Sequence, residues 1–177
     1  MSDTLIARLS HPAEREAAFS ELVHCFTPPL YAVIRRLVIW HDDADDVLQE
    51  TFLKAWAGLE NFKGESSLYS WLYRIAVNES LTFLNRRKRC QPLSETEEGL
   101  AERLEADPYF DGEETERQLQ EAISQLPEKQ RVVFNMKYFD ELKYEEMAAI
   151  LDTSVGALKA SYHIAVKKVE NFFHRLD

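Results

Sequence analysis

A strongly acidic segment divides this chain into two parts. Residues 94–114 hold nine acidic residues and one basic residue, a net charge of −8, whereas residues 1–93 and 115–177 each carry a net charge of −1. A segment with so much self-repulsion and so few bulky apolar side chains is poorly suited to a core, so we expect an acidic flexible linker there. The sequence therefore predicts two small domains, 1–93 and 115–177, joined by the linker 94–114.

Both flanking parts are predicted to be helical, which makes the fold class all-α. Glycine and proline are scarce, and apolar residues recur at helical spacing. The consecutive residues Pro28 and Pro29 are expected to end a helix, because proline lacks the amide that a helix interior needs. The expected helices are Glu14 to Phe26, about Leu30 to Trp40, Ala44 to Ala57, Leu68 to about Arg89, about Thr115 to Gln125, Pro127 to Tyr138, Tyr144 to Leu151, and Val155 to about His174.

Several classes of function are disfavoured by what the chain lacks. No run approaches the roughly 20 apolar residues of a membrane span, and the N-terminus does not resemble a signal peptide, so we expect a cytoplasmic protein without membrane insertion. Cys25 and Cys90 lie far apart without metal-ligand spacing, which favours two reduced thiols. No nucleophile–base pair or phosphate-binding glycine loop is found. We therefore expect no enzyme, no catalytic residue, no cofactor and no metal site.

The stretch HDDADDVLQE places five carboxylates at the start of a predicted helix. They suit the positive end of the helix dipole, and they lack the interleaved spacing of a calcium loop. Capping together with an acidic docking surface is the favoured interpretation. The helix that follows is expected to bury one face, formed by Val47, Leu48, Phe52, Leu53 and Trp56.

A polar stripe runs along the helix predicted from Leu68 to Arg89. An ordinary solvated face would explain it, but the stripe is rich in amides and hydroxyls and ends in the four bases RRKR, which favours nucleic acid. The preceding loop, NFKGESS, has the aromatic, glycine and hydroxyl residues that a pocket for an unstacked base needs, although Phe62 could instead fill the core. The stripe consists of Ser70, Arg74, Asn78, Thr82, Asn85 and Arg89.

The last two predicted helices have the spacing of a helix-turn-helix, with the turn DTS between them. Lys159, His163 and Lys167 lie at four-residue intervals on the second of these helices, where they would face the major groove. A plain helical hairpin with a solvated face remains the alternative.

Three stretches resemble bacterial RNA polymerase sigma factors of the extracytoplasmic-function class. They are DDADDVLQETFLKAW, FKGESSLYSWLYRIAVN and LPEKQRVVFNMKYFDELKYEEMAAILDTSVGALKASYHIAVKKVE, in this order around the acidic segment. The resemblance implies a first domain that binds core RNA polymerase and opens the promoter −10 element, and a second domain that reads the −35 element as duplex. It also implies that the linker threads the nucleic-acid channel of the polymerase, and it leaves an anti-sigma factor open as a further partner.

The resemblance and the polar stripe together assign roles to individual residues. Core-polymerase contacts fall on Asp46, Gln49 and Glu50. Ala160, Ser161 and Ile164 stand where members of the family often carry arginines. Contacts with −10 DNA fall on Phe62, Lys63, Gly64, Ser66, Ser67, Arg74, Asn78, Arg86, Arg87, Lys88 and Arg89, and contacts with −35 DNA on Gly156, Lys159, Ala160, Ser161, His163 and Lys167.

The function expected from these assignments is promoter-specific transcription initiation. A helix-turn-helix regulator that binds DNA without polymerase is the main alternative, and an all-α adaptor that binds only protein is the second. Run-off transcription with core polymerase separates the three, because only a sigma factor confers specific initiation.

Overall fold

A computed structural model of the protein describes residues 2–62, 64, 66–90 and 114–176. No strand occurs in these ranges, and the all-α prediction is confirmed. The predicted linker lies outside the described residues except for Glu114, which begins a helix. The chain divides into two compact units, Met1–Phe83 and Leu84–Asp177. The predicted domain limits at residues 93 and 115 stay a prediction.

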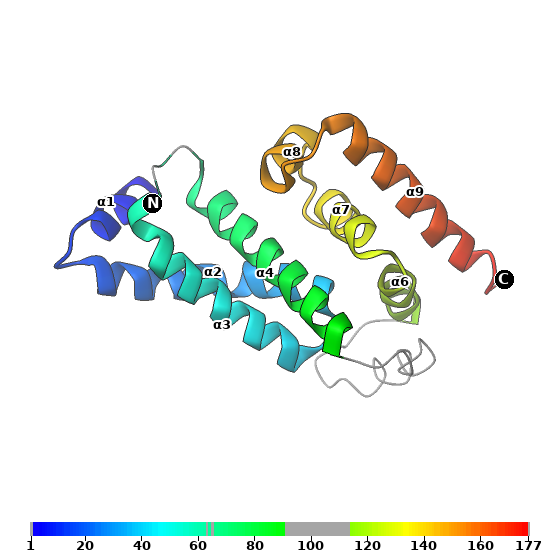
Figure 1. Cartoon of the computed structure of the whole chain (residues 1–177), viewed down its shortest axis with the longest axis horizontal. Coiled ribbons are helices and arrows are strands. Elements are labelled where there is room, and N and C mark those ends of the chain that lie inside the picture. The colour runs from blue at the N-terminus through cyan, green and yellow to red at the C-terminus, as the bar shows by residue number, and fades with distance from the viewer. Residues whose placement is uncertain (1, 63, 65, 91–113, 177) are drawn as a thin grey trace. The chain divides into compact units, whose positions relative to one another are not determined.

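The first unit is built around a long helix, α2, that packs against its neighbours α1 and α3 (Figure 1). An ion pair of 2.7 Å between Lys54 Nζ and Glu79 Oε2 joins α3 to α4. Apolar side chains from α2 and α4 are the most deeply buried, among them Leu22, Leu30, Ile34 and Leu72. The elements are α1 (Ser2–Ser10), α2 (Arg15–Val38), α3 (His41–Gly58), the short 3-10 helix η1 (Leu59–Asn61) and α4 (Leu68–Cys90), within which the boundary between the units falls.

Helix α2 continues through both prolines, so the predicted break there is wrong. A proline inside a helix costs about 3 kcal/mol, because its ring is crowded and one hydrogen bond is lost. The carbonyl groups that lose their partners belong to His24 and Cys25, two exposed residues whose carbonyls water can reach. Leu22, on one side of the prolines, and Leu30, on the other, are fully buried. Each such side chain contributes about 1.5–3 kcal/mol. Val33, Ile34, Leu37 and Val38 are buried beyond the prolines as well, so burial of one continuous helix outweighs the local cost.

Helix α1 was not predicted from the sequence. It has only nine residues, too few for the periodic pattern to stand out. Its stability comes from contact with α2, since Leu5 and Leu9, one turn apart, are both buried. Arg15 Nε also donates a hydrogen bond of 3.2 Å to the Leu9 carbonyl and so holds the corner between the two helices.

Within residues 114–176, the part of the second unit that the structure describes beyond α4, three helices pack on a fourth, α9. Their bounds differ from the predicted ones by a residue or two at most, and Figure 1 shows the short α8 leading into the long α9. The helices are α6 (Glu114–Ser124), α7 (Glu128–Tyr138), α8 (Tyr144–Leu151) and α9 (Val155–Phe173). The core consists of Ala122, Ile123, Leu126, Phe134, Ala165, Val169 and Phe172.

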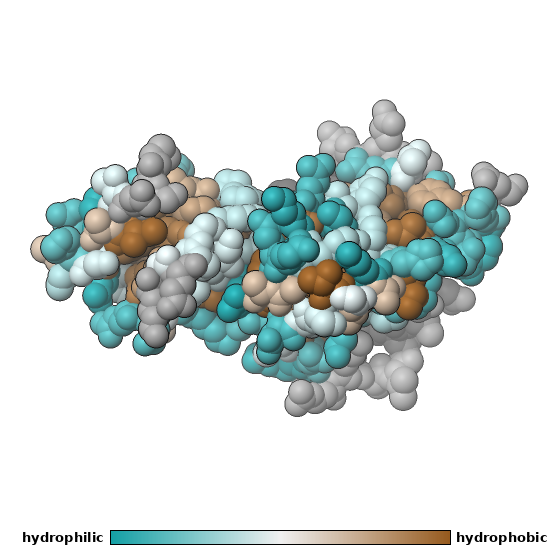
Figure 2. Space-filling model, turned by 90° about the horizontal axis from the view of Figure 1, so that it is seen from above, coloured by the Kyte–Doolittle hydropathy of each residue, from teal (hydrophilic) through white to brown (hydrophobic). Residues whose placement is uncertain are grey.

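Polar residues cover most of the face seen in Figure 2, and the apolar residues that reach it form separate patches. Within the described ranges, no helix combines the length and the apolar character that crossing a bilayer would require.

Candidate functional site

The three predicted core-polymerase residues lie on one exposed face of α3. Asp46, Gln49 and Glu50 are all exposed, and their spacing of three and four residues places them side by side on the helix. Neither Asp46 nor Glu50 forms an ion pair with another described residue, in contrast to Asp45, whose carboxylate lies 3.4 Å from His41 Nε2. Two carboxylates and an amide are therefore available to an external partner with donor groups.

The same face continues into two large apolar side chains. Leu53 is 64% exposed and Trp56 is 43% exposed, so the prediction that they belong to the buried face of α3 is wrong. The face that packs inward carries Ala44, Val47, Leu48, Thr51 and Ala55 instead. We name Asp46, Gln49, Glu50, Leu53 and Trp56 the α3 docking surface.

An aromatic contact supports the apolar end of the α3 docking surface. The centres of the Trp56 and Phe19 rings lie 4.9 Å apart, with the rings edge to face. The centres of the Phe19 and Phe52 rings lie 6.5 Å apart. Such pairs are worth about 0.5–1.5 kcal/mol beyond their burial, so Trp56 is held in place although it is partly exposed. An exposed aromatic side chain that is held in place is typical of a protein-binding surface, and polar residues such as the neighbouring carboxylates suit the rim of one.

The loop between η1 and α4 brings Phe62 against α4. The centres of the Phe62 and Trp71 rings lie 5.0 Å apart, and the planes of the two rings are tilted by 43°. The Phe62 side chain is half-buried. Phe62 therefore neither fills the core nor projects freely. Gly64 has a φ of +72°, a left-handed conformation that glycine adopts without strain. Lys63 lies outside the described residues.

Ser67 caps the helix that follows this loop. Its Oγ accepts a hydrogen bond of 3.0 Å from the Ser70 amide and lies 2.8 Å from Ser70 Oγ. Both Ser66 and Ser67 are exposed. The cap fixes where α4 begins, and it leaves hydroxyl groups at the positive end of the helix dipole.

The polar stripe on α4 is exposed as predicted. Arg74, Asn78, Thr82 and Asn85 are all exposed, and Ser70 is half-buried. Arg86 is exposed and Arg87 half-buried at the end of α4; Lys88 and Arg89 belong to the same helix, but their side chains lie outside the described set. Because α4 rises about 1.5 Å per residue, Ser67 and Asn78 lie roughly 15 Å apart along it. The two ends of this surface therefore cannot hold the same base.

Helices α8 and α9 form the helix-turn-helix, and both ends of the turn are stabilised locally. Asp152 has a φ of 49°, a left-handed conformation that Asp tolerates better than most residues. Ser154 then caps α9, because its Oγ accepts a hydrogen bond of 3.2 Å from the Ala157 amide. At the start of α8, Glu146 Oε2 accepts a hydrogen bond of 2.8 Å from the Lys143 amide.

The predicted −35 residues lie on the outer side of α9. All of them are exposed except Ser161, which is half-buried, while Leu158 and Ala165 on the other side are buried. Lys159 Nζ lies 5.5 Å from the centre of the Tyr144 ring, and Lys137 Nζ lies 5.2 Å from it. The −35 residues are Gly156, Lys159, Ala160, Ser161, His163 and Lys167.

Tyr144 is a residue that the sequence did not single out. An aromatic ring attracts an ammonium group, so Tyr144 restrains Lys159 on the outer face of α9. Burial, and then the nearby phenols of Tyr144 and Tyr138, raise the pKa of Tyr162 above its usual value. Tyr162 therefore adds no negative charge beside the lysine at neutral pH.

We predict that Ser154→Ala destabilises the second unit by about 1 kcal/mol, because the cap of α9 is lost. Denaturant unfolding followed by circular dichroism measures the change, and Ser154→Asp, which keeps an acceptor at the cap, should restore most of the stability. Equal stability of wild type and Ser154→Ala would show that the cap contributes nothing.

Comparisons with known proteins agree with this arrangement. The family described as Sigma-70 region 2 matches residues 22–90, and Sigma-70, region 4 matches residues 116–169. The ECF RNA polymerase sigma-E factor of Salmonella typhimurium is 32% identical over 166 residues, which cover 88% of this chain and 86% of the relative. The RNA polymerase sigma-H factor of Pseudomonas aeruginosa is 33% identical over 166 residues, 88% of this chain and 85% of the relative.

Two solved structures share the fold. One is CnrH in complex with the cytosolic domain of CnrY, with a TM-score of 0.71, 24% identity, and coverage of 98% of this chain and 97% of the other. The second is the sigma factor RpoE in complex with the anti-sigma factor NepR from Bartonella quintana, with a TM-score of 0.69, 24% identity, and coverage of 88% and 96%. With both sigma regions matched in order and relatives aligned over most of its length, the chain belongs to the ECF family of RNA polymerase sigma factors and directs transcription initiation.

Proposed function

We propose that three surfaces divide the work of initiation. The α3 docking surface binds core RNA polymerase, the Phe62–Ser67 loop and the polar stripe of α4 open the −10 element, and the outer face of α9 reads the −35 element. The observation that supports this division most directly is the exposed stripe on α4, which runs from Ser70 into the basic cluster Arg86–Arg89. Because bacterial transcription takes place in the cytoplasm, this function also places the chain there.

Promoter-specific run-off transcription with purified core polymerase tests the function as a whole. We expect the full chain to give transcripts that start at one promoter position, and core polymerase alone to give none. Binding to duplex DNA without any effect on polymerase would favour the regulator, and no effect on either would favour the adaptor. Membership of the sigma family speaks against both alternatives.

The −10 surface is long enough to hold more than one nucleotide. Unstacking a base costs a few kcal/mol, so the protein must replace stacking and base-edge hydrogen bonds. Phe62, which packs against Trp71 near the start of α4, offers an aromatic wall. Asn78, seven residues beyond Trp71, offers an amide with both a donor and an acceptor about 10 Å further along the helix. We therefore assign these two residues to different nucleotides of the non-template strand.

The basic cluster at the end of α4 has a different task. Contacts of Arg and Lys with phosphates position a protein on DNA without reading the sequence. Arg86, which is exposed, and its three neighbours are therefore assigned to the phosphate backbone next to the opened segment.

The outer face of α9 is assigned to the −35 duplex. Lys159, His163 and Lys167 supply donors for phosphates and base edges, and Ala160 offers an apolar contact of the kind that a thymine methyl group accepts. The small side chains at Gly156 and Ala160 allow α9 to approach the groove closely.

Two further assignments extend beyond the described residues or beyond this chain. We assign residues 94–114 to an acidic connection between the domains 1–93 and 115–177, attracted to the basic nucleic-acid channel of the polymerase. The structures of RpoE with NepR and of CnrH with CnrY favour an anti-sigma factor as a partner for this chain as well. The exposed Leu53 and Trp56 are the groups that we expect such a partner to cover.

We predict that Asn78→Ala lowers open-complex formation about tenfold at the preferred −10 base, because one set of base-edge hydrogen bonds is lost. The loss should shrink on templates that carry another base at that position. Permanganate footprinting on matched and pre-melted templates measures the opening. Gln125→Ala, which removes an exposed amide outside every proposed DNA-binding surface, is the control and should leave opening unchanged on every template. Opening by Asn78→Ala that equals wild type on every template would remove Asn78 from the capture surface.

A further inference from the structure

A buried carboxylate of α4 is paired with a lysine of α3. Lys54 Nζ donates a hydrogen bond of 2.7 Å to Glu79 Oε2. The Glu79 side chain is only 10% exposed, whereas the Lys54 side chain is 49% exposed. An ionised carboxylate is costly to bury without a partner of opposite charge, and Lys54 supplies that partner.

Both members of this pair lie next to the proposed binding surfaces. Lys54 directly follows Leu53 of the α3 docking surface, and Glu79 directly follows Asn78 of the polar stripe. Successive residues of a helix are rotated by about 100°, so Asn78 is exposed while Glu79 turns inward and reaches α3. One ion pair therefore links the helix that carries the docking surface to the helix that carries the stripe.

Lys54 has a second carboxylate within reach on its own helix. Glu50 precedes it by four residues, a spacing at which glutamate and lysine form ion pairs on a helix surface. The structure nevertheless pairs Lys54 with Glu79. Glu50 is exposed and hydrated, so it gains little from a lysine, whereas Glu79 is shielded from water. The Glu50 carboxylate is thereby left available to an external partner.

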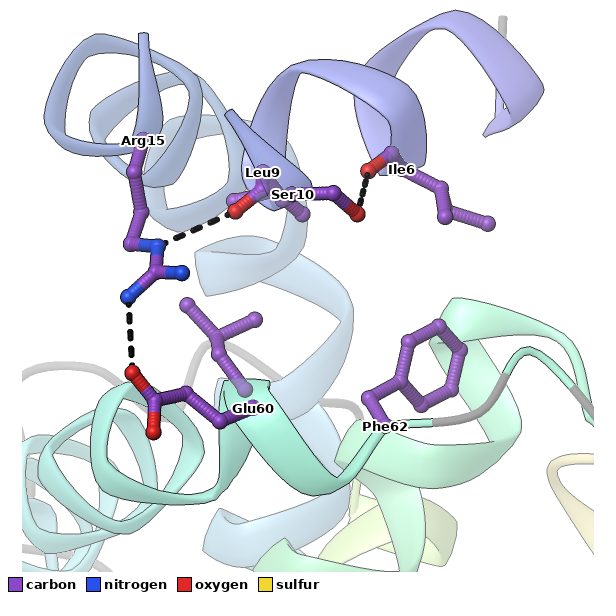
Figure 3. A pocket seen from close by; sticks show the side chains of 7 residues that line it. Ile6, Leu9, Ser10, Arg15, Glu60 and Phe62 are labelled. Atoms are coloured by element: carbon purple, nitrogen blue, oxygen red, sulfur yellow. Dashed lines mark hydrogen bonds and ion pairs between the residues drawn. The ribbon is translucent and has the colours of Figure 1, made fainter. Parts of the chain in front are cut away.

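An exposed ion pair of the same unit shows the contrast. Arg15 of α2 lies 3.1 Å from Glu60 of η1, at the edge of a pocket of about 350 Å³ that Ser10 of α1 and Phe62 also line (Figure 3). The Glu60 side chain is 74% exposed, and ion pairs this exposed contribute little to stability. That pair can open at small cost. Opening the pair between α3 and α4 instead leaves a carboxylate unpaired inside the protein.

We infer that Lys54 and Glu79 are positioning residues that fix α4 on α3 while the promoter opens. The inference rests on the proposed roles of the α3 docking surface and the polar stripe. During opening, polymerase holds α3, and α4 must keep bases unpaired although unstacking them is unfavourable. A charge-assisted hydrogen bond is short and directional, whereas apolar packing is non-directional and lets helices slide. The ion pair therefore keeps the stripe in register with the polymerase-bound helix.

Replacing both partners by methionine tests this role without leaving a buried charge. Lys54→Met combined with Glu79→Met keeps the net charge, and apolar replacements of buried ion pairs often preserve the fold. On a matched promoter, holoenzyme with this variant should form open complexes about tenfold less favourably, the loss expected for one hydrogen bond between charged groups. On a pre-melted template the bases are already unpaired, so binding should change by about twofold or less. Permanganate footprinting measures opening, and anisotropy measures binding.

Two matched variants separate positioning from stability. Lys54→Arg keeps a charge-assisted hydrogen bond to Glu79 and should open the matched promoter as wild type does. Arg8→Met combined with Glu21→Met removes an ion pair between α1 and α2, also without a change in net charge, and should leave opening unchanged. Denaturant unfolding measures the stability of each variant, and the opening defect should persist at a temperature where all of them are fully folded.

Asn78→Ala distinguishes a failure of this inference from a failure of the proposed function. If Asn78→Ala lowers opening while the methionine pair opens the matched promoter like wild type, the stripe acts as proposed and the inference is wrong. If the methionine pair shows the selective loss and Asn78→Ala shows none, the positioning of α4 stands and the assignment of Asn78 fails. An equal loss on matched and pre-melted templates would show that the pair only maintains the fold, and the inference would be overturned. A Lys54→Arg variant as defective as the methionine pair would overturn it as well, because the ion pair would then not be what positions α4.

Discussion

Replacing both Asp46 and Glu50 by lysine is expected to lower the affinity for core RNA polymerase on the order of 100-fold. Both carboxylates are exposed on α3, and neither has an ion-pair partner among the described residues. Their replacement therefore breaks nothing inside the protein and acts on the partner alone. Each reversal turns an attraction into a repulsion across the interface. Competition against a labelled sigma factor for core polymerase measures the change.

A substitution at the apolar end of the α3 docking surface distinguishes two explanations of a lower affinity for core polymerase. If the surface docks as a unit, Leu53→Asp should weaken core binding as well, because this 64% exposed side chain would be buried in the complex. If the carboxylates only steer the encounter, the double reversal should slow association and leave dissociation unchanged.

Glu16→Lys combined with Glu170→Lys is the charge-matched control. Both residues are exposed on helices other than α3, so this variant reproduces the change in net charge. Circular dichroism confirms that each variant is folded. Core affinity of the Asp46/Glu50 variant equal to that of the control would place the docking surface elsewhere.

The sequence predicts best those elements whose signals are local. Helix α4 begins at Leu68 as expected, because the serines before it and the apolar spacing within it are read directly from the chain. The same holds for α8 and α9, where the turn DTS supplies both the left-handed Asp152 and the cap Ser154. The resemblance to sigma factors then assigned functions to these helices that their spacing alone left open.

Predictions that depend on the tertiary structure are wrong in two places. The prolines of α2 are a local argument for a break, but burial on both sides of them decides the outcome. Leu53 and Trp56 have the residue types of a core, and nothing in their spacing shows that the folded protein leaves them exposed. The exposed fraction of a side chain is the quantity that separates these cases.

The pocket beside Phe62 shows a third limit on what the sequence alone can predict. Glu60 lies 45 residues after Arg15, and no motif joins it to Arg15 or Ser10. They meet only because the unpredicted helix α1 packs on α2 and so faces η1 across a gap. A sequence pattern finds groups that share one helix face, whereas a site assembled from three elements requires their packing.

Replacing Arg86, Arg87, Lys88 and Arg89 by glutamine is expected to weaken binding to −10 DNA on every promoter alike. Each phosphate contact contributes about 0.9 to the slope of log K against log salt for duplex DNA, so four lost contacts should reduce the slope by roughly 3.5. The loss of affinity should therefore be largest at low salt and fade as salt rises. Titration of holoenzyme with a fork-junction template across a salt series measures both quantities.

The base preference is what distinguishes this variant from Asn78→Ala. Phosphates carry no sequence information, so the ranking of −10 bases should survive the loss of the basic cluster, while Asn78→Ala should change the ranking and keep the salt slope. A variant with Lys129, Lys143, Lys168 and Arg175 replaced by glutamine removes the same charge from exposed positions of the second unit. On a template that ends before the −35 element, this control should keep the wild-type slope. Equal slopes for the control and the basic-cluster variant would show that net charge, rather than contact by the end of α4, attracts the promoter.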